Sequence, residues 1–534
     1  MDTKALRQKI LDLAIRGKLV PQDPNDEPAS VLLERIRAEK QQMVKDGKLK
    51  AKDIKNDTVI FLGDDNLHYE KFPDGTVKCI EDEIPFELPE GWEWCRLSTI
   101  SQYISDGDHQ PPPQTDDGIP FLVISNVSNG FLDFTSTRYV SPDYYNGIAE
   151  YRKPCKGDLL FTVTGSYGIP VLVNENKPFC FQRHIAIIRP IIISNSFLSY
   201  ELGTSYIKTI CDNQSTGTAQ KTVGLATLRS FILPIPPITE QQRIESKIKE
   251  LLLLTDNIES DKTDLQTTIQ LTKSKILDLA IKGKLVPQNP DDEPASVLLD
   301  RIRAEKEELI KQGKIKRDKK ESVIYKGDDN SYYEKIGDTV TCIDEELPFD
   351  IPENWAWVRL QTCCQKEIKR GKSPKYTESS GTLVFAQKCN TKYDGINMDL
   401  ALYLDESTLV KYPDDEYMQD KDTVINSTGT GTLGRVGIYR RTDNRREMPV
   451  VPDSHVTVIR ANNEISAEYI YHFLKAYQQE LEKLGEGSTN QKELKQLTLK
   501  NLIVALPPYA EQERIIEIIT AAFEIMTNIE KSLN

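Results

Sequence analysis

The longest regular pattern in the sequence is an apolar seam between residues 239 and 284. Apolar residues recur there at alternating steps of four and three, and a few polar residues such as Lys262 fill the remaining seam positions. A sustained heptad spacing keeps one stripe of a helix facing a partner helix over its whole length. The apolar seam residues are Ile244, Ile248, Leu251, Ile258, Leu265, Ile269, Ile276 and Leu279. At about 1.5 Å per residue the seam predicts a rod of roughly 50 Å.

The start of this helix is also marked in the sequence. Pro236 and Pro237 stop the preceding segment, and Thr239 with Gln242 three residues later can form a capping box. A long helix buried inside one globular domain is the alternative interpretation. The repeats in the rest of the chain favour the coiled-coil rod.

A long-period repeat divides the chain into two halves. KILDLAIRGKLVPQDPNDEPASVLLERIRAEK at 9–40 returns almost letter for letter at 275–306. GDDNLHYEK at 63 returns as GDDNSYYEK at 327, and IPFELPEGWEWCRL returns as LPFDIPENWAWVRL. QKTVGLATLRSFILPIPPITEQQRI at 220 returns as QKELKQLTLKNLIVALPPYAEQERI at 491. A repeat of this period determines the architecture before any local prediction is made.

The phase of the repeat predicts how the helices pair. The central helix joins one EQxRI start to one KILDLAI end, whereas the two termini hold the same pieces separately. The terminal seam residues that match the central ones include Ile515, Ile519, Met526, Ile10 and Leu13. We therefore predict a pseudo-two-fold molecule, built from a circularly permuted repeat, in which the central helix forms an antiparallel coiled coil with the terminal helices.

Two stretches of different character lie between the helical parts, at roughly 85–238 and 348–509. Short alternating runs with turn signals, such as GDLLFTVTGSYGIPVLV and DTVINSTGTGTLGRVGIY, predict mixed α/β domains rich in strand. Their interiors match poorly although the flanking repeats match well. A duplicated scaffold that carries two diverged domains indicates two related sites with different ligands.

Composition narrows the class of protein. The 534 residues include 38% hydrophobic and 28% charged residues, which is typical of a soluble globular chain of several domains. The nine cysteines show no CxxC spacing, so we predict reduced thiols, no structural metal site and a cytoplasmic location. No apolar run is long enough to span a bilayer, and no signal peptide is present.

The net charge of -14 argues at first against nucleic acid as a ligand. The acidity is concentrated in the helical and linker parts, however. Residues 98–238 hold ten Lys and Arg against eleven Asp and Glu, and residues 361–509 hold twenty against twenty. Local basic clusters at 366–375 and 440–446 can neutralise phosphates. The two strand-rich domains therefore stay compatible with DNA.

Several motifs together resemble one known family, the specificity subunits of type I restriction-modification systems. The resemblance rests on GKLVPQ followed by DEPASVLLERIRAEK, on PFELPEGWEW and PFDIPENWAW, and on PPxxEQxRI at the start of each heptad helix. It covers essentially the whole chain. It implies five parts: a helical block at 1–60, target recognition domain 1 at 61–238, a central helical region at 239–325, target recognition domain 2 at 326–509 and a C-terminal helix at 510–534.

The resemblance also implies a function and partners. Each recognition domain would read one half of a bipartite double-stranded DNA target, and the coiled coil would space the domains and dock two methyltransferase subunits and the restriction subunits. This chain would be non-catalytic and would bind no cofactor itself. S-adenosylmethionine, ATP and Mg would belong to the partner subunits.

Candidate DNA-binding residues follow from side-chain chemistry and from this resemblance, because base reading needs paired donors and acceptors on projecting loops. In the first domain the candidates are Asp108, His109, Gln110, Ser166, Tyr167, Gln182, Arg183, His184, Gln220 and Lys221. In the second domain they are Arg370, Lys372, Ser373, Gln387, Lys388, Asn390, Thr430, Thr432, His455, Asn490, Gln491 and Lys492. Any one of them could instead be an ordinary turn residue, and the two histidines could be structural.

The sequence contains partial matches to enzymatic motifs but no complete motif. GTGTLG at 429–434 fits GxGxxG but precedes the strand-like RVGIY where a dinucleotide fold needs a helix. LPPY at 506–509 has Leu506 where an amino-methyltransferase needs Asn or Asp. The rival from another class is a coiled-coil scaffold whose duplicated domains bind protein or glycan.

Overall fold

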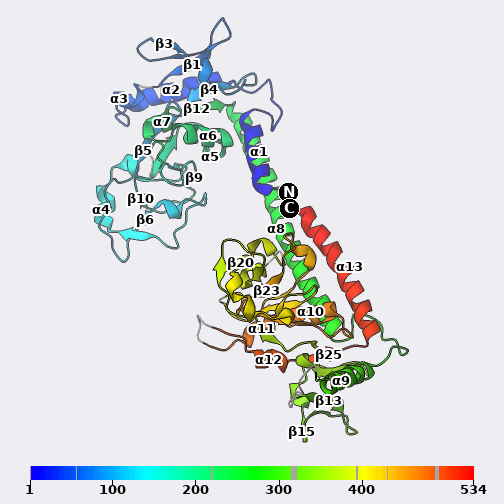
Figure 1. Ribbon diagram of the computed structural model, residues 1–534. Helices are drawn as coiled ribbons and strands as arrows, with labels where there is room; N and C mark the ends of the chain where they lie inside the picture. The colour runs from blue at the N-terminus through cyan, green and yellow to red at the C-terminus, as the bar shows by residue number, and fades with distance from the viewer. Residues whose placement is uncertain are drawn as a thin grey trace. The chain divides into compact units, whose positions relative to one another are not determined.

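The computed structural model describes residues 2–55, 57–217, 221–313, 321–392, 395–429, 431–487 and 492–533. Figure 1 shows the chain as a ribbon. It divides into two compact units, Met1–Lys262 and Thr263–Asn534, which we describe one after the other. The boundary falls inside the long helix α8, Ile238–Ile281, whose 44 residues contribute to both units.

Unit 1 contains helices at both ends and strands between them. Its helices are α1 (Thr3–Ile15), α2 (Ala29–Lys45), α3 (Ala51–Ile54), α4 (Pro142–Gly147), α5 (Asn195–Leu202), α6 (Ser205–Gln214), α7 (Leu225–Arg229) and the first part of α8. Its strands are β1 (Val59–Leu62), β2 (His68–Lys71), β3 (Val77–Cys79), β4 (Glu93–Arg96), β5 (Ser101–Asp106), β6 (Ile119–Leu122), β7 (Arg138–Val140), β8 (Leu159–Thr162), β9 (Pro170–Leu172), β10 (Cys180–Phe181), β11 (Ile185–Pro190) and β12 (Ile232–Ile235).

In unit 1 the N-terminal helix α1 packs against α8, as the heptad pattern predicts. Ile10 and Ala14 share a buried cluster with Ile244 and Ile248, and further along Arg7 forms an ion pair with Asp256. The chain numbers thus run in opposite directions along the two helices. The pairing of α1 with the start of the central helix is antiparallel, which confirms that part of the prediction.

Unit 2 repeats this plan. Its helices are the rest of α8, α9 (Ala295–Lys311), α10 (Ala467–Ala476), α11 (Gln478–Lys483), α12 (Gln496–Lys500) and α13 (Tyr509–Leu533). Its strands are β13 (Ser322–Lys326), β14 (Tyr332–Ile336), β15 (Thr339–Cys342), β16 (Ala356–Arg359), β17 (Lys369–Arg370), β18 (Tyr376–Thr377), β19 (Leu383–Phe385), β20 (Leu402–Leu404), β21 (Thr423–Asn426), β22 (Val436–Ile438), β23 (Val450–Pro452), β24 (Val456–Ile459) and β25 (Ile503–Leu506).

The C-terminal helix α13 packs on α8 within unit 2. Ile515 and Ile519 are fully buried in a core that also contains Leu277 and Ile281. At the other end of the contact, the Lys273 Nζ lies 2.8 Å from a carboxylate oxygen of Glu530. This pairing is again antiparallel and mirrors the pairing of α1 in unit 1.

The seam is buried at its ends and open in the middle of α8. Ile258 is 36% exposed and Leu265 is 39% exposed. Thr255, the polar seam residue just before Ile258, is only 1% exposed. Leu251, Ile276, Leu279, Leu13 and Met526 are half-buried, and Ile269 is buried. The apolar seam positions are therefore not all covered, contrary to the strict expectation from the heptad.

The predicted capping box at Thr239 is wrong. The helix begins one residue earlier, at Ile238, and the Thr239 hydroxyl donates to a carboxylate oxygen of Asp26. The side chain of Gln241 instead donates to the carbonyl of Pro236 at 2.9 Å, and Gln512 donates in the same way to Pro507 at 2.9 Å. The glutamine of the repeated EQ motif therefore ties the start of each long helix to the proline segment that precedes it.

The glutamate of the same motif anchors the helix start to a buried tryptophan. Trp92 Nε1 donates to Glu240 at 2.9 Å, and Trp355 Nε1 donates to Glu511 at 3.0 Å. Burial raises the pKa of both carboxyls, and the tryptophan hydrogen bonds oppose that shift. The same contact at both positions explains why the GWEW and NWAW segments are repeated together with EQxRI.

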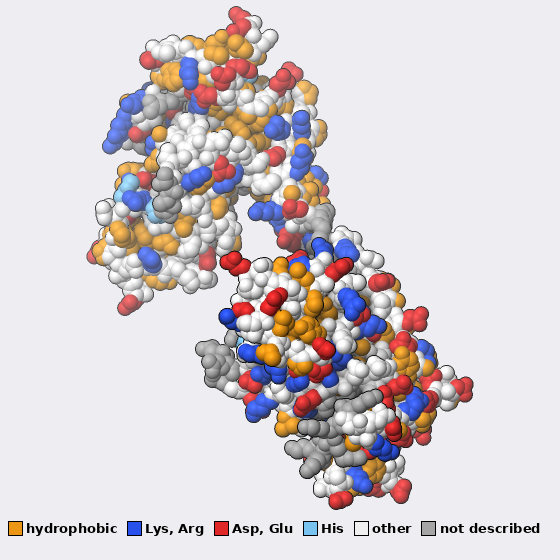
Figure 2. All heavy atoms as spheres, viewed as in Figure 1, with side chains coloured by type: hydrophobic (Ala, Val, Ile, Leu, Met, Phe, Trp, Pro, Cys, Tyr) orange, Lys and Arg blue, Asp and Glu red, His pale blue; other side chains and the backbone are white. Residues whose placement is uncertain are grey.

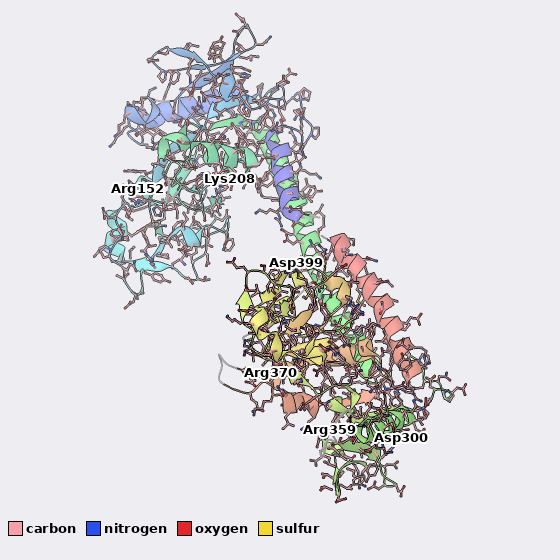
Figure 3. The ribbon with its side chains drawn as sticks, viewed as in Figure 1. Arg152, Lys208, Asp300, Arg359, Arg370 and Asp399 are labelled. Atoms are coloured by element: carbon pink, nitrogen blue, oxygen red, sulfur yellow. The ribbon has the colours of Figure 1, made fainter. Side chains whose placement is uncertain are left out.

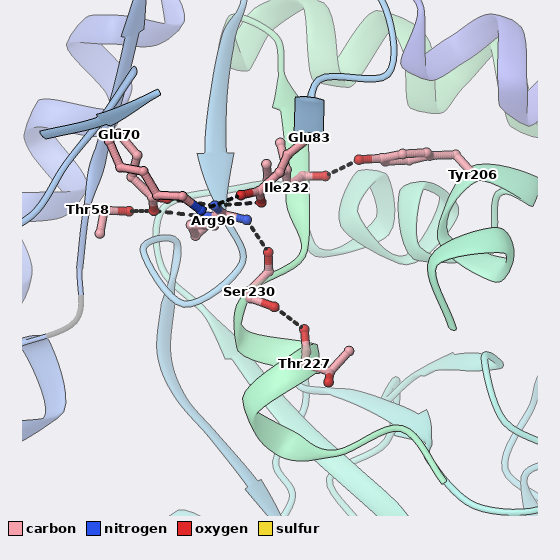
Figure 4. Close-up of polar contacts among 9 residues, drawn as sticks. Thr58, Glu70, Glu83, Arg96, Tyr206, Thr227, Ser230 and Ile232 are labelled. Atoms are coloured by element: carbon pink, nitrogen blue, oxygen red, sulfur yellow. Dashed lines mark hydrogen bonds and ion pairs between the residues drawn. The ribbon is translucent and has the colours of Figure 1, made fainter. Parts of the chain in front are cut away.

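An arginine ties the small sheet to the rest of its unit; it is buried in unit 1 and half-buried in unit 2. Figure 4 shows Arg96 of β4 between Glu70 of β2 and the carbonyl of Ser230. Two parallel bonds of 3.0 and 2.6 Å join the guanidinium to Glu70. Arg359 and Glu334 form the same pair in unit 2, at 2.8 and 2.6 Å. Such paired, buried bonds fix an orientation as well as a distance.

None of the described helices is long and apolar enough to cross a membrane. The nine cysteines are all free thiols.

Candidate nucleic-acid interface

The four-stranded sheet of unit 1 gathers the predicted residues of the first domain at one edge. Its strand order is β5-β11-β8-β9. Asp106 at the end of β5 pairs with Ala186 near the start of β11, and Thr162 at the end of β8 pairs with Ile185. The segments after β5, after β8 and before β11 therefore leave the sheet side by side. They contain the first-domain candidates from Asp108 to His184.

Lys221 reaches the same edge from the segment before α7. Thr164 and Thr222 form a β-bridge, and the backbone N–H of Gly165 donates to the carbonyl of Lys221 at 3.1 Å. His109, Gln110, Ser166, Arg183 and Lys221 are exposed, whereas Asp108, Tyr167, Gln182 and His184 are half-buried. Four segments that are far apart in the sequence thus form one polar surface.

Charged partners shape this surface. Tyr144 donates to a carboxylate oxygen of Asp108, and a guanidinium nitrogen of Arg152 lies 3.8 Å from the other oxygen. His109 Nε2 lies 2.9 Å from Asp106. Asp108, Tyr144 and Arg152 border a hollow of about 360 Å³ between the loop after β5 and α4. A carboxylate and a guanidinium beside one hollow can accept from and donate to a base edge.

Tyr167 lies on the other side of this edge. Lys208 stands 3.9 Å above its ring, and the Tyr167 hydroxyl donates to Asp212 at 2.7 Å. Figure 3 labels Lys208 and Arg152, which come from different elements of unit 1. Partial burial and the neighbouring Arg183 lower the pKa of His184, so this ring is neutral at physiological pH.

The second domain has the same arrangement on its own sheet, β17-β24-β21-β22. Arg370 at the end of β17 pairs with Thr457, and Asn426 at the end of β21 pairs with Val456. Lys372 forms a bridge with Asp453, and Thr428 forms a bridge with Glu493. Arg370, Lys372, Ser373, Thr432, His455 and Lys492 therefore lie along one edge, in the places that their counterparts have in unit 1.

The basic cluster at 366–375 is largely paired with carboxylates. Lys369 lies 2.6 Å from Glu416, Arg370 lies 2.6 Å from Glu493, and Lys375 lies 2.8 Å from Asp405. Lys375 is largely exposed, and a surface pair such as Lys375–Asp405 contributes about 0–1 kcal/mol, so this lysine can exchange its partner for a phosphate at little cost. Glu416 is buried, so Lys369 compensates a buried carboxylate and is held in place. The cluster is thus less positive than its sequence indicates. Figure 3 labels Arg370 in this region.

Asn390 is a correction to the predicted site. Its side chain is 1% exposed and donates to the carbonyl of Arg435 at 3.0 Å and to the side chain of Asn426 at 3.3 Å. It cannot present its amide to a base in this conformation. The neighbouring Gln387 is half-buried and bonds Thr432 at 3.4 Å, while Lys388 is exposed. Asn390 therefore supports the loop and leaves its surface to other residues.

Four predicted residues lie outside the described part of the chain: Gln220, Thr430, Asn490 and Gln491. The two histidines differ in their surroundings. His184 is half-buried, whereas His455 is exposed and its Nδ1 lies 2.6 Å from the Thr428 hydroxyl.

A glycine permits the close approach of chains at the start of each polar edge. A Cβ on Gly107 would lie 2.0 Å from the carbonyl oxygen of Phe181, and a Cβ on Gly371 would lie 2.0 Å from that of Pro452. No side chain fits there. At Gly107 the loop after β5 crosses the end of β10, which leads to His184. At Gly371 the loop after β17 crosses the end of β23, which leads to His455.

The GTGTLG segment joins β21 to β22, which pair antiparallel. A dinucleotide-binding glycine loop instead joins a strand to a helix. The structure thus agrees with the rejection of that motif.

Several residues that shape the edge could not be predicted from the sequence. Tyr144 and Arg152 come from the α4 region, and Glu416 comes from a 3-10 turn, Asp414–Glu416. Their positions depend on the tertiary fold and on no local spacing. Comparison of the two repeats could not identify these residues either, because the interiors of the two strand-rich domains match poorly.

Comparison with known proteins identifies the class that this fold and edge define. The family model "Type I restriction modification DNA specificity domain" matches residues 89–267 and again residues 352–534. The two matched segments cover well over half of the chain, so the protein belongs to this family. The first match ends inside α8, and the second includes the whole of α13.

Individual relatives agree with the family. The chain is 28% identical to the type I restriction enzyme EcoEI specificity subunit of Escherichia coli, over 99% of this chain and 90% of that protein. It is 32% identical to the EcoAI specificity subunit of Escherichia coli, over 67% of this chain and 62% of that protein. A solved chain from a study of complex assembly and conformational transition of the type I R-M system superposes with a TM-score of 0.57 at 17% identity, covering 84% of this chain and 94% of that chain.

Proposed function

We propose that this chain is the subunit that gives a type I restriction-modification enzyme its DNA sequence specificity. Each unit would read one half of a bipartite target with the polar edge of its four-stranded sheet. The observation that carries this proposal is the convergence of four separate segments on the corresponding edge of both sheets. Projecting loops with donors, acceptors and cations suit the major groove.

The divergence of the two edges supports different half-sites. Asp108 in unit 1 and Lys372 in unit 2 occupy equivalent positions. Asp108 forms a β-bridge with Gln182 just before β11, and Lys372 forms one with Asp453 just before β24. A carboxylate accepts from an exocyclic amine, whereas an ammonium donates to purine or phosphate oxygens. Equivalent positions with opposite chemistry would select different bases.

The chain itself would be non-catalytic. Methyl transfer would belong to partner methyltransferase subunits that bring S-adenosylmethionine, and translocation and cleavage would belong to restriction subunits that use ATP and Mg. Two copies of the methyltransferase, one for each half-site, fit the two-fold repeat of the scaffold. Such a complex would act on DNA in the cytoplasm.

Salt dependence of DNA binding tests this proposal against a protein- or glycan-binding scaffold. Purified chain with its methyltransferase should bind random duplex DNA at low salt and lose affinity steeply as salt rises, because phosphate contacts release counterions. A duplex that contains the target should be held more tightly at every salt concentration. The absence of any duplex binding at low salt would favour the scaffold.

A further inference from the structure

Each unit carries a small three-stranded sheet outside the part of the chain that the family model matches. In unit 1 it is β1-β2-β3, and in unit 2 it is β13-β14-β15. The matches begin at residues 89 and 352, after these sheets. In Figure 1, β1 and β3 lie on the side of β4 away from β5 and β6, and β13 and β15 lie on the side of β25 away from β20 and β23. Each sheet therefore lies outside the matched segment of its unit, and it recurs in both units.

The inner face of each sheet is bound to its unit. In unit 1, Ile60 packs with Trp94, and the neighbouring Glu70 forms the buried pair with Arg96. In unit 2, Ile324 and Glu334 have the same positions. Arg96 hydrogen bonds lower the pKa of Glu70 despite the opposing effect of burial, so the pair is charged at neutral pH. The sheet is thus held in a fixed orientation.

The strand register determines which side chains form the opposite, outer face. Phe61 lies across from Tyr69, which lies across from Cys79, and Lys71 lies between Val59 and Val77. In unit 2 the register gives Tyr325, Tyr333 and Cys342 in one row and Val323, Lys335 and Val340 in the other. Side chains directly opposite each other point to the same face.

The two outer faces carry the same chemistry position by position. Five of the six places have identical residue types, and the sixth has Phe61 or Tyr325. The aromatic rings are 5.9 Å apart in unit 1 and 6.0 Å apart in unit 2. Tyr69 and Tyr333 each donate to an aspartate of the adjoining turn at 2.7 Å. The recognition domains diverged while this surface did not.

These faces are open to solvent. Phe61 is 38% and Val77 49% exposed in unit 1, and Tyr325 is 43% and Val340 49% exposed in unit 2. Exposed aromatic and aliphatic side chains gathered on one face are typical of protein interaction sites, where aromatic residues supply much of the binding energy. If these faces bound nothing, polar residues could replace the apolar ones in either unit. Both units instead keep the apolar residues.

Acidic residues surround both faces. Residues 59–83 hold seven Asp and Glu against two Lys, and residues 322–346 hold the same numbers. Figure 2 shows hydrophobic and acidic side chains side by side over the unit 1 sheet. The complementary surface is an apolar patch rimmed by Lys and Arg, since matched potentials favour association.

We propose that each outer face binds one copy of the same partner chain, through an apolar patch with a basic rim on that partner. Two equal faces need two copies. Because each face belongs to a unit with one recognition domain, the partner is the chain that modifies one half-site, the methyltransferase. This inference rests on the proposed function and locates a contact for it.

The exposed valines of the two sheets provide a matched test. Val77→Asp and Val340→Asp replace equally exposed residues and leave the inner faces unchanged. Full-length variants would be mixed with the methyltransferase, and the stoichiometry and affinity measured by native mass spectrometry and light scattering. Each single variant should weaken one of the two methyltransferase sites at least tenfold, so that a 1:1 complex predominates, and the double variant should weaken both.

Two further variants separate binding from folding. Charge reversal by Asp64→Lys or Asp328→Lys in the exposed turns should weaken the same sites without touching the sheet's apolar residues. Val410→Asp, at a residue that is 91% exposed in the second domain, should leave two copies bound. Equal loss in Val410→Asp would overturn the inference.

Unchanged binding of two copies by both valine variants would also overturn it while leaving the proposed function intact. Failure of the unmodified chain to bind methyltransferase and to recognise DNA would instead contradict the proposed function.

Discussion

At the scale of single residues, Glu201 is the most unusual group in unit 1. It lies on α5, is 0% exposed, and neither carboxylate oxygen has a hydrogen-bond partner among the described residues. Burial raises its pKa well above the ordinary value. In unit 2 the residue seven positions after the matching N-cap serine is Phe473, which is fully buried. A carboxyl thus occupies a site made for an apolar side chain.

Replacing Glu201 should therefore stabilise unit 1 in a pH-dependent way. A carboxyl with a raised folded-state pKa stabilises the fold at pH values below its unfolded pKa and loses that contribution as pH rises. We expect Glu201→Met to raise the free energy of unfolding by about 1–3 kcal/mol at neutral pH, the cost of an unpaired buried polar group. Melting temperatures at pH 5 and pH 8 should show a larger gain at pH 8.

The exposed Glu175→Met is the control and should show no such trend. Equal melting temperatures for Glu201→Met and the unmodified chain at pH 8 would contradict this explanation.

Arg183 and Lys221 allow base and phosphate contacts to be distinguished on the first edge. Both are exposed, and Arg183 projects between β10 and β11. We predict that Arg183→Ala costs about 1–3 kcal/mol on the target duplex and relaxes the preference at one base pair. Lys221→Ala should weaken target and random duplexes alike and reduce the salt slope by about one. Binding titrations at several salt concentrations measure both effects.

Equal weakening of target and random duplexes by Arg183→Ala would show that this arginine contacts only the backbone.

The individual site residues could be predicted from the sequence only in part. The donor and acceptor chemistry of the side chains, together with the family resemblance, predicted the exposed positions His109, Arg183 and Lys388. The buried Asn390 has the same residue chemistry, and only the packing of the loop against Asn426 reveals its role. Partners such as Glu416, which binds Lys369 from a distant turn, follow from the tertiary fold alone.

At the scale of elements, the heptad pattern predicted α8 closely because its period is a direct consequence of helix geometry. The helix spans Ile238–Ile281, against an expected 239–284. Its antiparallel partners in each unit followed from the phase of the repeat. The capping box of α8 did not form, because the Thr239 hydroxyl donates to Asp26 and the Gln241 amide donates to the Pro236 carbonyl.

Inserting one heptad into α8 tests its proposed role as a spacer. Contacts from α1 reach Glu259, and contacts from α13 reach Gln270, so an insertion after Asp261 keeps both sets. Seven residues add about 10 Å and almost two full turns. At 3.4 Å per base pair the unread spacer of the target should grow by about three base pairs. Methylome sequencing of cells that carry the whole system measures this.

Identical half-sites with an unchanged spacer in the insertion variant would refute the spacer role of α8.

At the scale of the whole molecule, one duplicated scaffold explains the features that the two units share. The tryptophan–glutamate bonds, the two arginine–glutamate pairs and the two outer faces recur with nearly the same geometry in both units. The polar edges are built on equivalent strands yet carry different residues. Constant parts would serve assembly, and variable parts would serve recognition.

The division of the target between the two domains is the central claim, and a domain exchange tests it most directly. Residues 98–238 would be replaced by the corresponding segment of another specificity subunit, with the second domain and both helical regions unchanged. The methylome of a host that expresses the complete system with this chain would then be sequenced. We predict a target with one new half-site, the original second half-site and the original spacer. A target altered in both halves would contradict the account.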